Sequence, residues 1–302
     1  MSVCFHPSGF ASTLPDFSMT ATPNSIHRPA PFTNHVIEAN GVRLNYLDYG
    51  AAGRTPMLCL HGGAVNAHWF DFVAAGFTGN YHVRALDQRG HGDSAHAQPP
   101  DYSYARYAAD VAQVVEKLDL RDFVLVGHSM GGLVSLVYAA TYPGRVKKIV
   151  IIDSTLVATP DRVQALHQVG GREGKSYATH DDFVSNFKVR PAGTTAAPEI
   201  LRYLAERSGR QGPDGVWRHK FDRNVYSKRV LLDIPPHWNR ITIPALLVKG
   251  GRSDRITPEI IADAKARCPH VDLVEVPGAD HHVTLDNPGG FVDVVNGWLG
   301  HP

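Results

Sequence analysis

The sequence predicts an α/β fold in which a mostly parallel sheet carries helices on both faces. Short apolar runs recur along the chain with helical patterns between them, an alternation typical of parallel strands joined by helical crossovers. One long stretch, residues 154–240, interrupts this alternation and predicts an insertion. The apolar runs cover residues 56–60, 83–86, 123–126, 146–152, 245–248 and 271–276.

The chain begins with a segment that shows neither helical nor strand periodicity. Residues 1–33 are rich in Pro, Ser, Thr and Ala, so we expect a mobile N-terminal tail. The tail lacks a basic start followed by an apolar run, so no secretory signal is predicted and a cytoplasmic location is expected. Met1 and Met19 both remain possible natural starts.

A hairpin and three helices complete the expected core, which comprises residues 34–153 and 241–302. Residues 35–38 and 42–49 alternate around Asn40-Gly41, a dipeptide that suits a two-residue hairpin turn, so we expect an antiparallel edge. Residues 104–118 carry apolar side chains at helical spacing. Thr257-Pro258 and Asn287-Pro288 each place a capping residue before a proline, which predicts that helices begin there.

The insertion is expected to be a helical cap over the ends of the strands. It has aromatic residues among charged ones and no apolar run long enough for a core strand. It contains 14 basic and 9 acidic residues, a net charge of +5, whereas the rest of the chain carries −4. The positive charge fits either a solvated helical surface or a surface that binds an anion, and both interpretations stay open.

Composition excludes several classes of function. The net charge of +1 over 302 residues provides no general attraction for nucleic acid, and no apolar run is long enough to span a membrane. The cysteines, Cys4, Cys59 and Cys268, are odd in number and widely spaced, which predicts free thiols, with Cys59 as a core residue. None of the 17 histidines shows the spacing of a metalloprotease motif, so no metal site is expected. The oligomeric state is left open.

The most informative segment runs from Phe123 to Leu133, FVLVGHSMGGL. An apolar strand passes through Gly-x-Ser-x-Gly into an apolar helix, which is the pattern of a nucleophile elbow in its required context. Side chains larger than hydrogen at Gly127 and Gly131 would collide with neighbouring backbone in so sharp a turn. Ser129 is therefore expected at an exposed helix N-terminus, where free N–H groups favour developing negative charge.

A serine nucleophile needs a base, and the base needs a carboxylate to orient it. Asp254 follows the apolar run at 245–248, and His281 follows the run at 271–276, so both are expected at the carboxyl ends of strands. Asp153, directly after the run at 146–152, is the alternative acid. His282 is the alternative base.

With these motifs, the chain resembles the alpha/beta-hydrolase superfamily from about residue 35 onward. Leu60-His61-Gly62-Gly63 is similar to the family's oxyanion loop, and the segment 87–94, DQRGHGDS, resembles a structural turn of the family. The resemblance implies an alpha/beta-hydrolase fold with a helical cap and no organic cofactor. It further implies Ser129 as nucleophile, His281 as base and Asp254 as acid, with the backbone N–H groups of Gly63 and Met130 as the oxyanion hole.

These residues predict a serine hydrolase that acts on a small-molecule carboxylic ester or lactone through an acyl-enzyme. Two alternatives remain. One is hydrolysis of a carbon–carbon bond in a ring-cleavage product, whose anionic substrates would suit the basic cap. The other is a ligand receptor on the same scaffold that turns over slowly or not at all.

Overall fold

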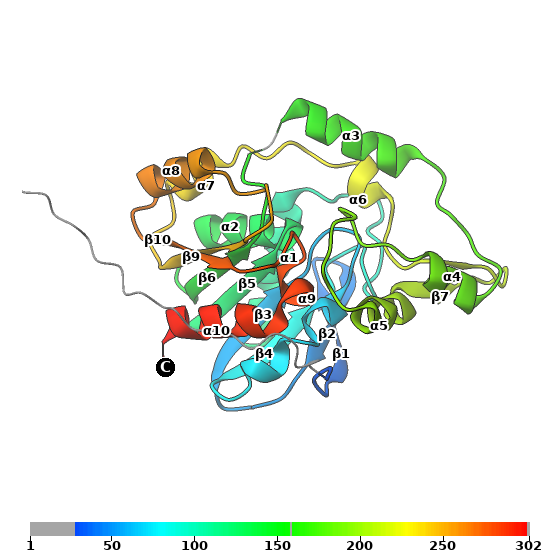
Figure 1. Ribbon diagram of the computed structural model, residues 1–302, viewed down its shortest axis with the longest axis horizontal. Helices are drawn as coiled ribbons and strands as arrows, with labels where there is room; N and C mark the ends of the chain where they lie inside the picture. The colour runs from blue at the N-terminus through cyan, green and yellow to red at the C-terminus, as the bar shows by residue number, and fades with distance from the viewer. Residues whose placement is uncertain (1–27, 158, 301–302) are drawn as a thin grey trace, which may run out of the picture.

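The structure is a computed structural model that describes residues 28–157 and 159–300, and its centre is one sheet of eight strands (Figure 1). The strands lie in the order β1-β2-β4-β3-β5-β6-β9-β10. β1 and β2 form the antiparallel hairpin, β2 pairs antiparallel with β4, and the remaining pairs are parallel. The predicted fold class and hairpin are thus confirmed. The strands are β1 (Thr33–Ala39), β2 (Val42–Asp48), β3 (Thr55–Leu60), β4 (Tyr81–Leu86), β5 (Phe123–His128), β6 (Val146–Ile152), β9 (Ala245–Gly250) and β10 (Val271–Val276).

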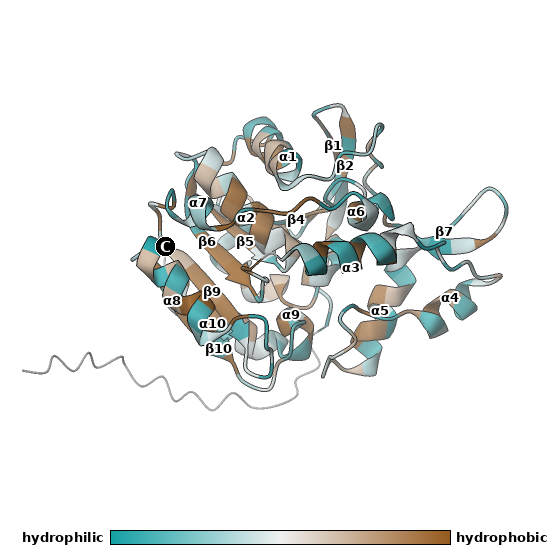
Figure 2. Cartoon of the chain, turned by 90° about the horizontal axis from the view of Figure 1, so that it is seen from above, coloured by the Kyte–Doolittle hydropathy of each residue, from teal (hydrophilic) through white to brown (hydrophobic). Residues whose placement is uncertain are grey.

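Helices cover both faces of the sheet, which explains why β3 and β5 are apolar on both faces. In β3, Leu58 and Leu60 face the core beneath α1 and α2, whereas Met57 and Cys59 face the core beneath α10. Figure 2 shows apolar residues in the strands at the centre and polar residues on α8 at the edge of the molecule. The covering elements are η1 (Ala67–Phe70), η2 (Ala74–Gly76), α1 (Tyr104–Lys117), α2 (Met130–Thr141), α8 (Pro258–Arg267), α9 (Val283–Asp286) and α10 (Pro288–Leu299).

The predicted starts of two of these helices are confirmed by their caps. The Thr257 hydroxyl accepts a hydrogen bond from the N–H of Ile260, and the Asn287 side chain accepts one from Gly290. Cys59 and Cys268 are free and buried, whereas Cys4 lies outside the described residues. No helix in the described part of the chain is both long and apolar enough to cross a membrane.

The segment 154–240, called the cap segment below, is mostly helical. Figure 1 shows α3 along the top of the view, with α4, α5 and β7 grouped to the right, beyond and below its far end. The segment also contains a small hairpin that the sequence analysis did not expect, since its strands are too short to leave an alternating pattern. The elements are α3 (Pro160–Gly171), α4 (His180–Asn186), α5 (Pro198–Ser208), β7 (Gly209–Gln211), β8 (Trp217–His219), α6 (Asn224–Ser227) and α7 (Pro235–Trp238).

The end of the cap segment and the end of the expected N-terminal tail both pack against the core. α7 packs against α2 through the fully buried Trp238, so the end of the cap segment belongs to the core packing. Most of the expected N-terminal tail, residues 1–27, lies outside the described residues. Of the rest, Ala30 is buried, and its N–H donates to the carbonyl of Asp71 at 2.7 Å.

The start of α2 is packed so closely that two positions there have room for hydrogen alone. A Cβ at Gly131 would stand 2.1 Å from the carbonyl oxygen of Leu60, and one at Gly127 would stand 2.3 Å from the carbonyl oxygen of Gly131. Neither contact can be relieved by turning a side chain, because both involve backbone atoms. The two glycines therefore allow β5, α2 and the end of β3 to meet.

We expect Gly131→Ala to lower the free energy of unfolding by about 2 to 3 kcal/mol, because the added methyl group overpacks a backbone contact. Gly297→Ala is the matched control. This exposed glycine of α10 has open space around its Cβ position, so alanine there is expected to stabilise the fold by about 0.5 to 1 kcal/mol. Urea denaturation measures both changes, and an unaltered midpoint for Gly131→Ala would contradict the packing argument.

Candidate active site

Ser129 occupies the sharp turn between β5 and α2, as the sequence pattern predicted. Its backbone has φ 52° and ψ −112°, a conformation that non-glycine residues adopt only under tertiary constraint. The constraint is visible in its hydrogen bonds: the N–H of Ser129 donates to Ile152 at 2.9 Å, and its carbonyl accepts from the Ser154 hydroxyl at 2.8 Å. The Ser129 side chain lines a cavity of about 420 Å³.

His281 lies on the loop after β10 and lines the same cavity as Ser129. Its ring is buried, with 3% of the residue exposed, and Nδ1 lies 2.8 Å from Oδ2 of Asp153. Nδ1–H donated to that carboxylate leaves Nε2 with its lone pair free. Within the described part of the chain, Nε2 of His281 and the Ser129 hydroxyl have no hydrogen-bond partner. Ser129 and His281 thus line one cavity, and no hydrogen bond joins their side chains in the described structure.

The structure corrects the prediction of the carboxylate that contacts this histidine. The side chain of Asp254 is 98% exposed, and its nearest charged partner is the adjacent Arg255 at 3.8 Å. Asp153 is fully buried and accepts three hydrogen bonds, from His281, from the Ser253 hydroxyl at 2.6 Å and from the N–H of Gly250 at 3.2 Å. The alternative acid of the sequence analysis is therefore the one that holds the imidazole.

Ser253 explains why the carboxylate at 254 points away. In the loop after β9, the inward position belongs to Ser253, which directs its hydroxyl at Asp153, and Asp254 is the next residue outward. Asp153 follows the last residue of β6 directly, so the strand itself fixes its place. The sequence signal for Asp153 is this immediate succession, whereas the sequence analysis prefers Asp254 because it occupies the commoner acid position of the family that the chain resembles.

The expected oxyanion donors lie beside the nucleophile. Gly63 and Met130 both line the cavity with Ser129, and Met130 is the first residue of α2. Among the described residues, neither of their N–H groups donates a hydrogen bond to the protein. Tyr226 of the cap segment, which the sequence analysis did not single out, also lines the cavity near Gly63, since a Cβ added at Gly63 would stand 3.2 Å from its hydroxyl.

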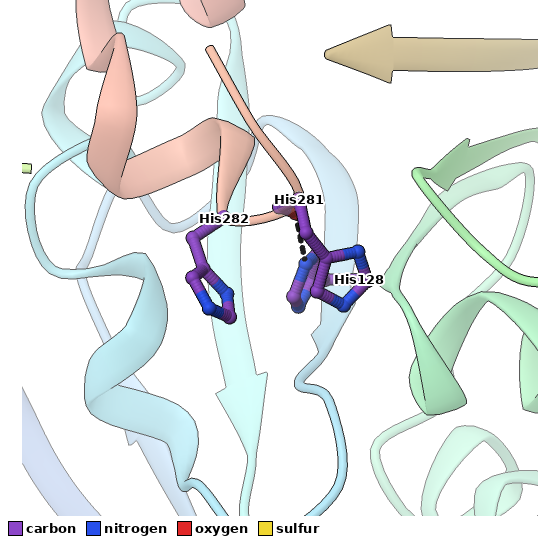
Figure 3. Close-up of side chains that lie close together, drawn as sticks. All are labelled: His128, His281 and His282. Atoms are coloured by element: carbon purple, nitrogen blue, oxygen red, sulfur yellow. Dashed lines mark hydrogen bonds between the residues drawn. The ribbon is translucent and has the colours of Figure 1, made fainter. Parts of the chain in front are cut away.

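Three histidines gather at this point of the structure (Figure 3). His128 precedes the nucleophile, and its Nε2 donates to the carbonyl of His281 at 2.9 Å. His282 donates Nε2–H to the carbonyl of Pro191 at 2.8 Å, so its partner is a neutral carbonyl. Only His281 of the three has a carboxylate on one nitrogen and a free lone pair on the other. This difference favours His281 over His282 as the base.

The same cluster is the set of described residues that could hold a metal ion. One ring nitrogen from each of His128, His281 and His282 lies within 4.8 Å of the other two. Each ring already donates one N–H to a carbonyl or carboxylate. Metal-bound histidines commonly donate the N–H of their other ring nitrogen in this way. A metal ion here would occupy Nε2 of His281, so metal binding and general-base action at this histidine exclude one another.

Burial controls the charge of the site. Burial lowers the pKa of His281 well below its ordinary value, and the neighbouring His282 and Arg255 act in the same direction. Burial raises the pKa of Asp153, and the hydrogen bonds from Ser253 and Gly250 partly offset this rise by lowering it. The resting imidazole is therefore neutral near pH 7, with its Nε2 lone pair unprotonated.

The turn that follows β4 has a structural role, as expected. Asp87 accepts hydrogen bonds from the N–H of Ala67 at 2.7 Å, from the N–H of Asp93 at 2.9 Å and from the Asn45 amide at 3.0 Å. His91 is buried behind this turn and bonds the carbonyl of Arg89. These contacts tie β2, η1 and the turn together beneath the cavity.

Comparison with known proteins agrees with this geometry. Residues 57–294 match the sequence pattern described as the alpha/beta hydrolase family. The chain belongs to the alpha/beta hydrolase family. It is 30% identical over 278 residues to a serine hydrolase-like protein of Danio rerio, with 83% of each chain covered. It is 29% identical to an esterase of Mycobacterium tuberculosis, covering 83% of this chain and 84% of the relative.

A further relative is similar in both sequence and structure. The hydrolase is 28% identical to 2-(acetamidomethylene)succinate hydrolase of Mesorhizobium japonicum, covering 85% of this chain and 91% of the relative. A crystal structure titled E-2-(acetamidomethylene)succinate hydrolase superposes with a TM-score of 0.79 at 25% identity. The superposition covers 89% of this chain and 99% of that one. The sheet, its crossovers and their order are thus those of the family.

The buried histidines predict how stability depends on pH. Burial lowers the pKa of His91 and of His128 well below the ordinary value, so these side chains bind protons near pH 6 only when the chain unfolds. Their stabilising contribution is fully present above an unfolded-state pKa of about 6.5 and is lost as the pH falls, by up to about 2 kcal/mol each at pH 5.

Urea denaturation between pH 7.5 and pH 5 measures this effect. His91→Gln, which keeps a donor for the Arg89 carbonyl, is expected to reduce the slope of unfolding free energy against pH. The exposed His270→Gln serves as the control and should keep the wild-type slope. A flat profile for the wild-type hydrolase would contradict the assignment of neutral buried imidazoles.

Proposed function

We propose that the protein is a serine hydrolase that cleaves carboxylic esters, lactones included, through an acyl-enzyme on Ser129. The observation that carries the proposal is the chain of contacts from Asp153 to His281 at the wall of the cavity that Ser129 enters. The neutral Nε2 accepts the Ser129 proton while the serine oxygen forms a bond to the substrate carbonyl carbon. The fold and the named esterase among the relatives support the same chemistry.

The rest of the cycle follows from proton balance. The carbonyl oxygen takes up negative charge, which the free N–H groups of Gly63 and Met130 stabilise, at about 3 kcal/mol for a good donor. The imidazolium returns its proton to the departing alcohol as the carbon–oxygen bond of the ester breaks. Water then repeats the sequence on the acyl-enzyme, with His281 again accepting the proton, and Ser129 is restored as the acid product leaves.

Asp153 is assigned the part expected of Asp254. Its carboxylate holds Nδ1–H of His281, which keeps the lone pair on Nε2 and stabilises the imidazolium as it forms. The hydrogen bonds from Ser253 and Gly250 fix the carboxylate in turn. A fixed carboxylate orients the ring without having to accept the proton itself.

Hydrolysis of a carbon–carbon bond next to a carbonyl is the second candidate, because the cavity favours anions. Its described lining contains no Asp or Glu side chain and contains four arginines, Arg162, Arg190, Arg229 and Arg255. The two reactions share the nucleophile and base and differ in the leaving group. A panel of short p-nitrophenyl esters, lactones and a ring-cleavage dienoate separates them by relative kcat/KM.

Ser129→Ala is expected to lower kcat for p-nitrophenyl butyrate by at least about 10⁴-fold, because nucleophile and base act as a unit. Mass spectrometry of the quenched wild-type protein should show an acyl group on the peptide that contains Ser129. Ser227→Ala, which does not line the cavity, is the control. Equal turnover by the wild type and Ser129→Ala would reject the serine mechanism, and failure of both to turn over any ester would favour a ligand receptor.

Asp153→Asn is expected to lower kcat by about 10³- to 10⁴-fold with KM little changed, because the amide no longer holds the required imidazole tautomer. Asp254→Asn should keep kcat near the wild-type value, since its side chain faces solvent. Thermal melts of both variants check the fold. Loss of activity in Asp254→Asn with activity kept in Asp153→Asn would reverse the assignment.

A further inference from the structure

Arg229 is a cationic side chain deep in the cavity wall of the cap segment. It lies between α6 and α7, only 5% exposed, and lines the cavity that contains Ser129. Its backbone is held in place, since the N–H donates to Tyr226 at 3.1 Å and the carbonyl accepts from His167 of α3 at 2.7 Å. The guanidinium is therefore presented by a fixed backbone.

This guanidinium has no counter-charge in the described structure. None of the ion pairs between described residues includes Arg229, and its Nε and Nη1 are buried without a hydrogen-bond partner. Its remaining nitrogen, Nη2, donates to the thioether sulfur of Met130 at 3.3 Å, and the Tyr104 side chain lies near enough to the guanidinium to be a further, uncharged hydrogen-bond partner. Buried charges in proteins are normally paired, because an unpaired charge loses its hydration with nothing in exchange.

The groups around Arg229 do not supply the missing anion. They are the tyrosines Tyr104, Tyr107 and Tyr226, together with the neutral His91. The guanidinium carbon lies 5.2 Å from the centre of the Tyr104 ring, a cation–π contact that compensates for only part of the lost hydration. Burial raises the pKa of the Tyr107 hydroxyl well above its ordinary value, so that group stays neutral as well.

The other cavity arginines differ from Arg229 in their surroundings. Arg162 and Arg255 both donate to the Thr155 hydroxyl, at 3.1 and 3.3 Å, and Arg255 also lies near Asp254. Arg162 and Arg190 are exposed, so water hydrates both guanidinium groups. Arg229 alone among the four combines deep burial with unpartnered nitrogens.

We propose that Arg229 binds a carboxylate on the acyl part of the substrate, and so makes this hydrolase selective for esters that carry an anionic group. The inference rests on the proposed function and names its substrate class. A planar carboxylate matches two parallel N–H groups of a guanidinium. Thioether sulfur is a weak acceptor on a flexible side chain, so a carboxylate displaces Met130 from Nη2.

The position of Arg229 also limits the length of the acyl chain. Arg229 contacts the side chain of Met130, whose own N–H is the expected oxyanion donor. The group that would bind the carboxylate and the N–H that would bind the carbonyl oxygen are thus joined by a single residue, Met130. This arrangement suits a short dicarboxylic acid esterified at one end.

A matched pair of substrates tests the proposal. In p-nitrophenyl hydrogen glutarate the acyl chain ends in a carboxylate, and in p-nitrophenyl pentanoate a methyl group replaces that carboxylate. We expect the wild type to prefer the glutarate in kcat/KM. Arg229→Met should lower kcat/KM for the glutarate by about 10- to 100-fold, the range for a lost charge-assisted hydrogen bond, and leave the pentanoate nearly unchanged. For Arg229→Lys, kcat/KM for the glutarate should lie between the values of the wild type and Arg229→Met.

Controls separate selectivity from folding. Arg202→Gln removes an exposed arginine of α5 that pairs with Glu206, and should preserve the preference for glutarate. Arg229→Met is expected to melt at a higher temperature than the wild type, because it removes an uncompensated buried charge. Equal losses on both substrates, or a glutarate preference kept in Arg229→Met, would overturn the proposal.

A binding measurement distinguishes failure of this inference from failure of the proposed function. Calorimetry with free glutarate is carried out on Ser129→Ala and on Ser129→Ala combined with Arg229→Met. Binding by the first variant and at least about tenfold weaker binding by the second supports the anion site even if no ester is hydrolysed. Equal glutarate binding by both variants overturns the anion site even if esters are hydrolysed through Ser129.

Discussion

The whole site depends on one backbone contact, the approach of the first turn of α2 to the end of β3. Because Gly131 lies against the carbonyl of Leu60, the chain between β5 and α2 has to turn within one residue. That residue is Ser129, which is forced into the left-handed region with its side chain directed into the cavity. The same turn leaves the N–H of Met130 free beside it. The proposed nucleophile and the proposed oxyanion donor thus result from one packing constraint.

The features that local sequence determines were predictable. Continuous apolar runs identified the central strands, Asn40-Gly41 located the hairpin, and the glycines around Ser129 located the sharp turn. The acid was not determined locally. Asp153 and Asp254 both follow strands that end at the same edge of the sheet, and only the path of the loop after β9 decides which carboxylate reaches His281. The hairpin of β7 and β8 was missed because three residues carry no readable alternation.

The net positive charge of the cap segment does not show which of its charges are unpaired. Arg210 and Lys220 both pair with Asp93 of the core, and Arg218 pairs with Asp214 within the cap hairpin. Much of the excess positive charge is therefore neutralised at the surface or hydrated there. The chemically significant charge is a single buried guanidinium, which a residue count treats like any other. Arg229 differs from the other charges because it is buried. The sequence of an irregular segment does not reveal that burial.

The hydrogen bond between Ser253 and Asp153 has a consequence for how such a site can evolve. The loops after β6 and β9 meet beside His281, because the Ser253 hydroxyl lies 2.6 Å from the Asp153 carboxylate that holds the imidazole. Their backbones already approach each other, since the N–H of Gly250 also contacts Asp153. Exchanging the two side chains would move the negative charge from one strand end to its neighbour without rerouting either loop. A carboxylate after β6 and a carboxylate after β9 could thus serve the same histidine in related sites.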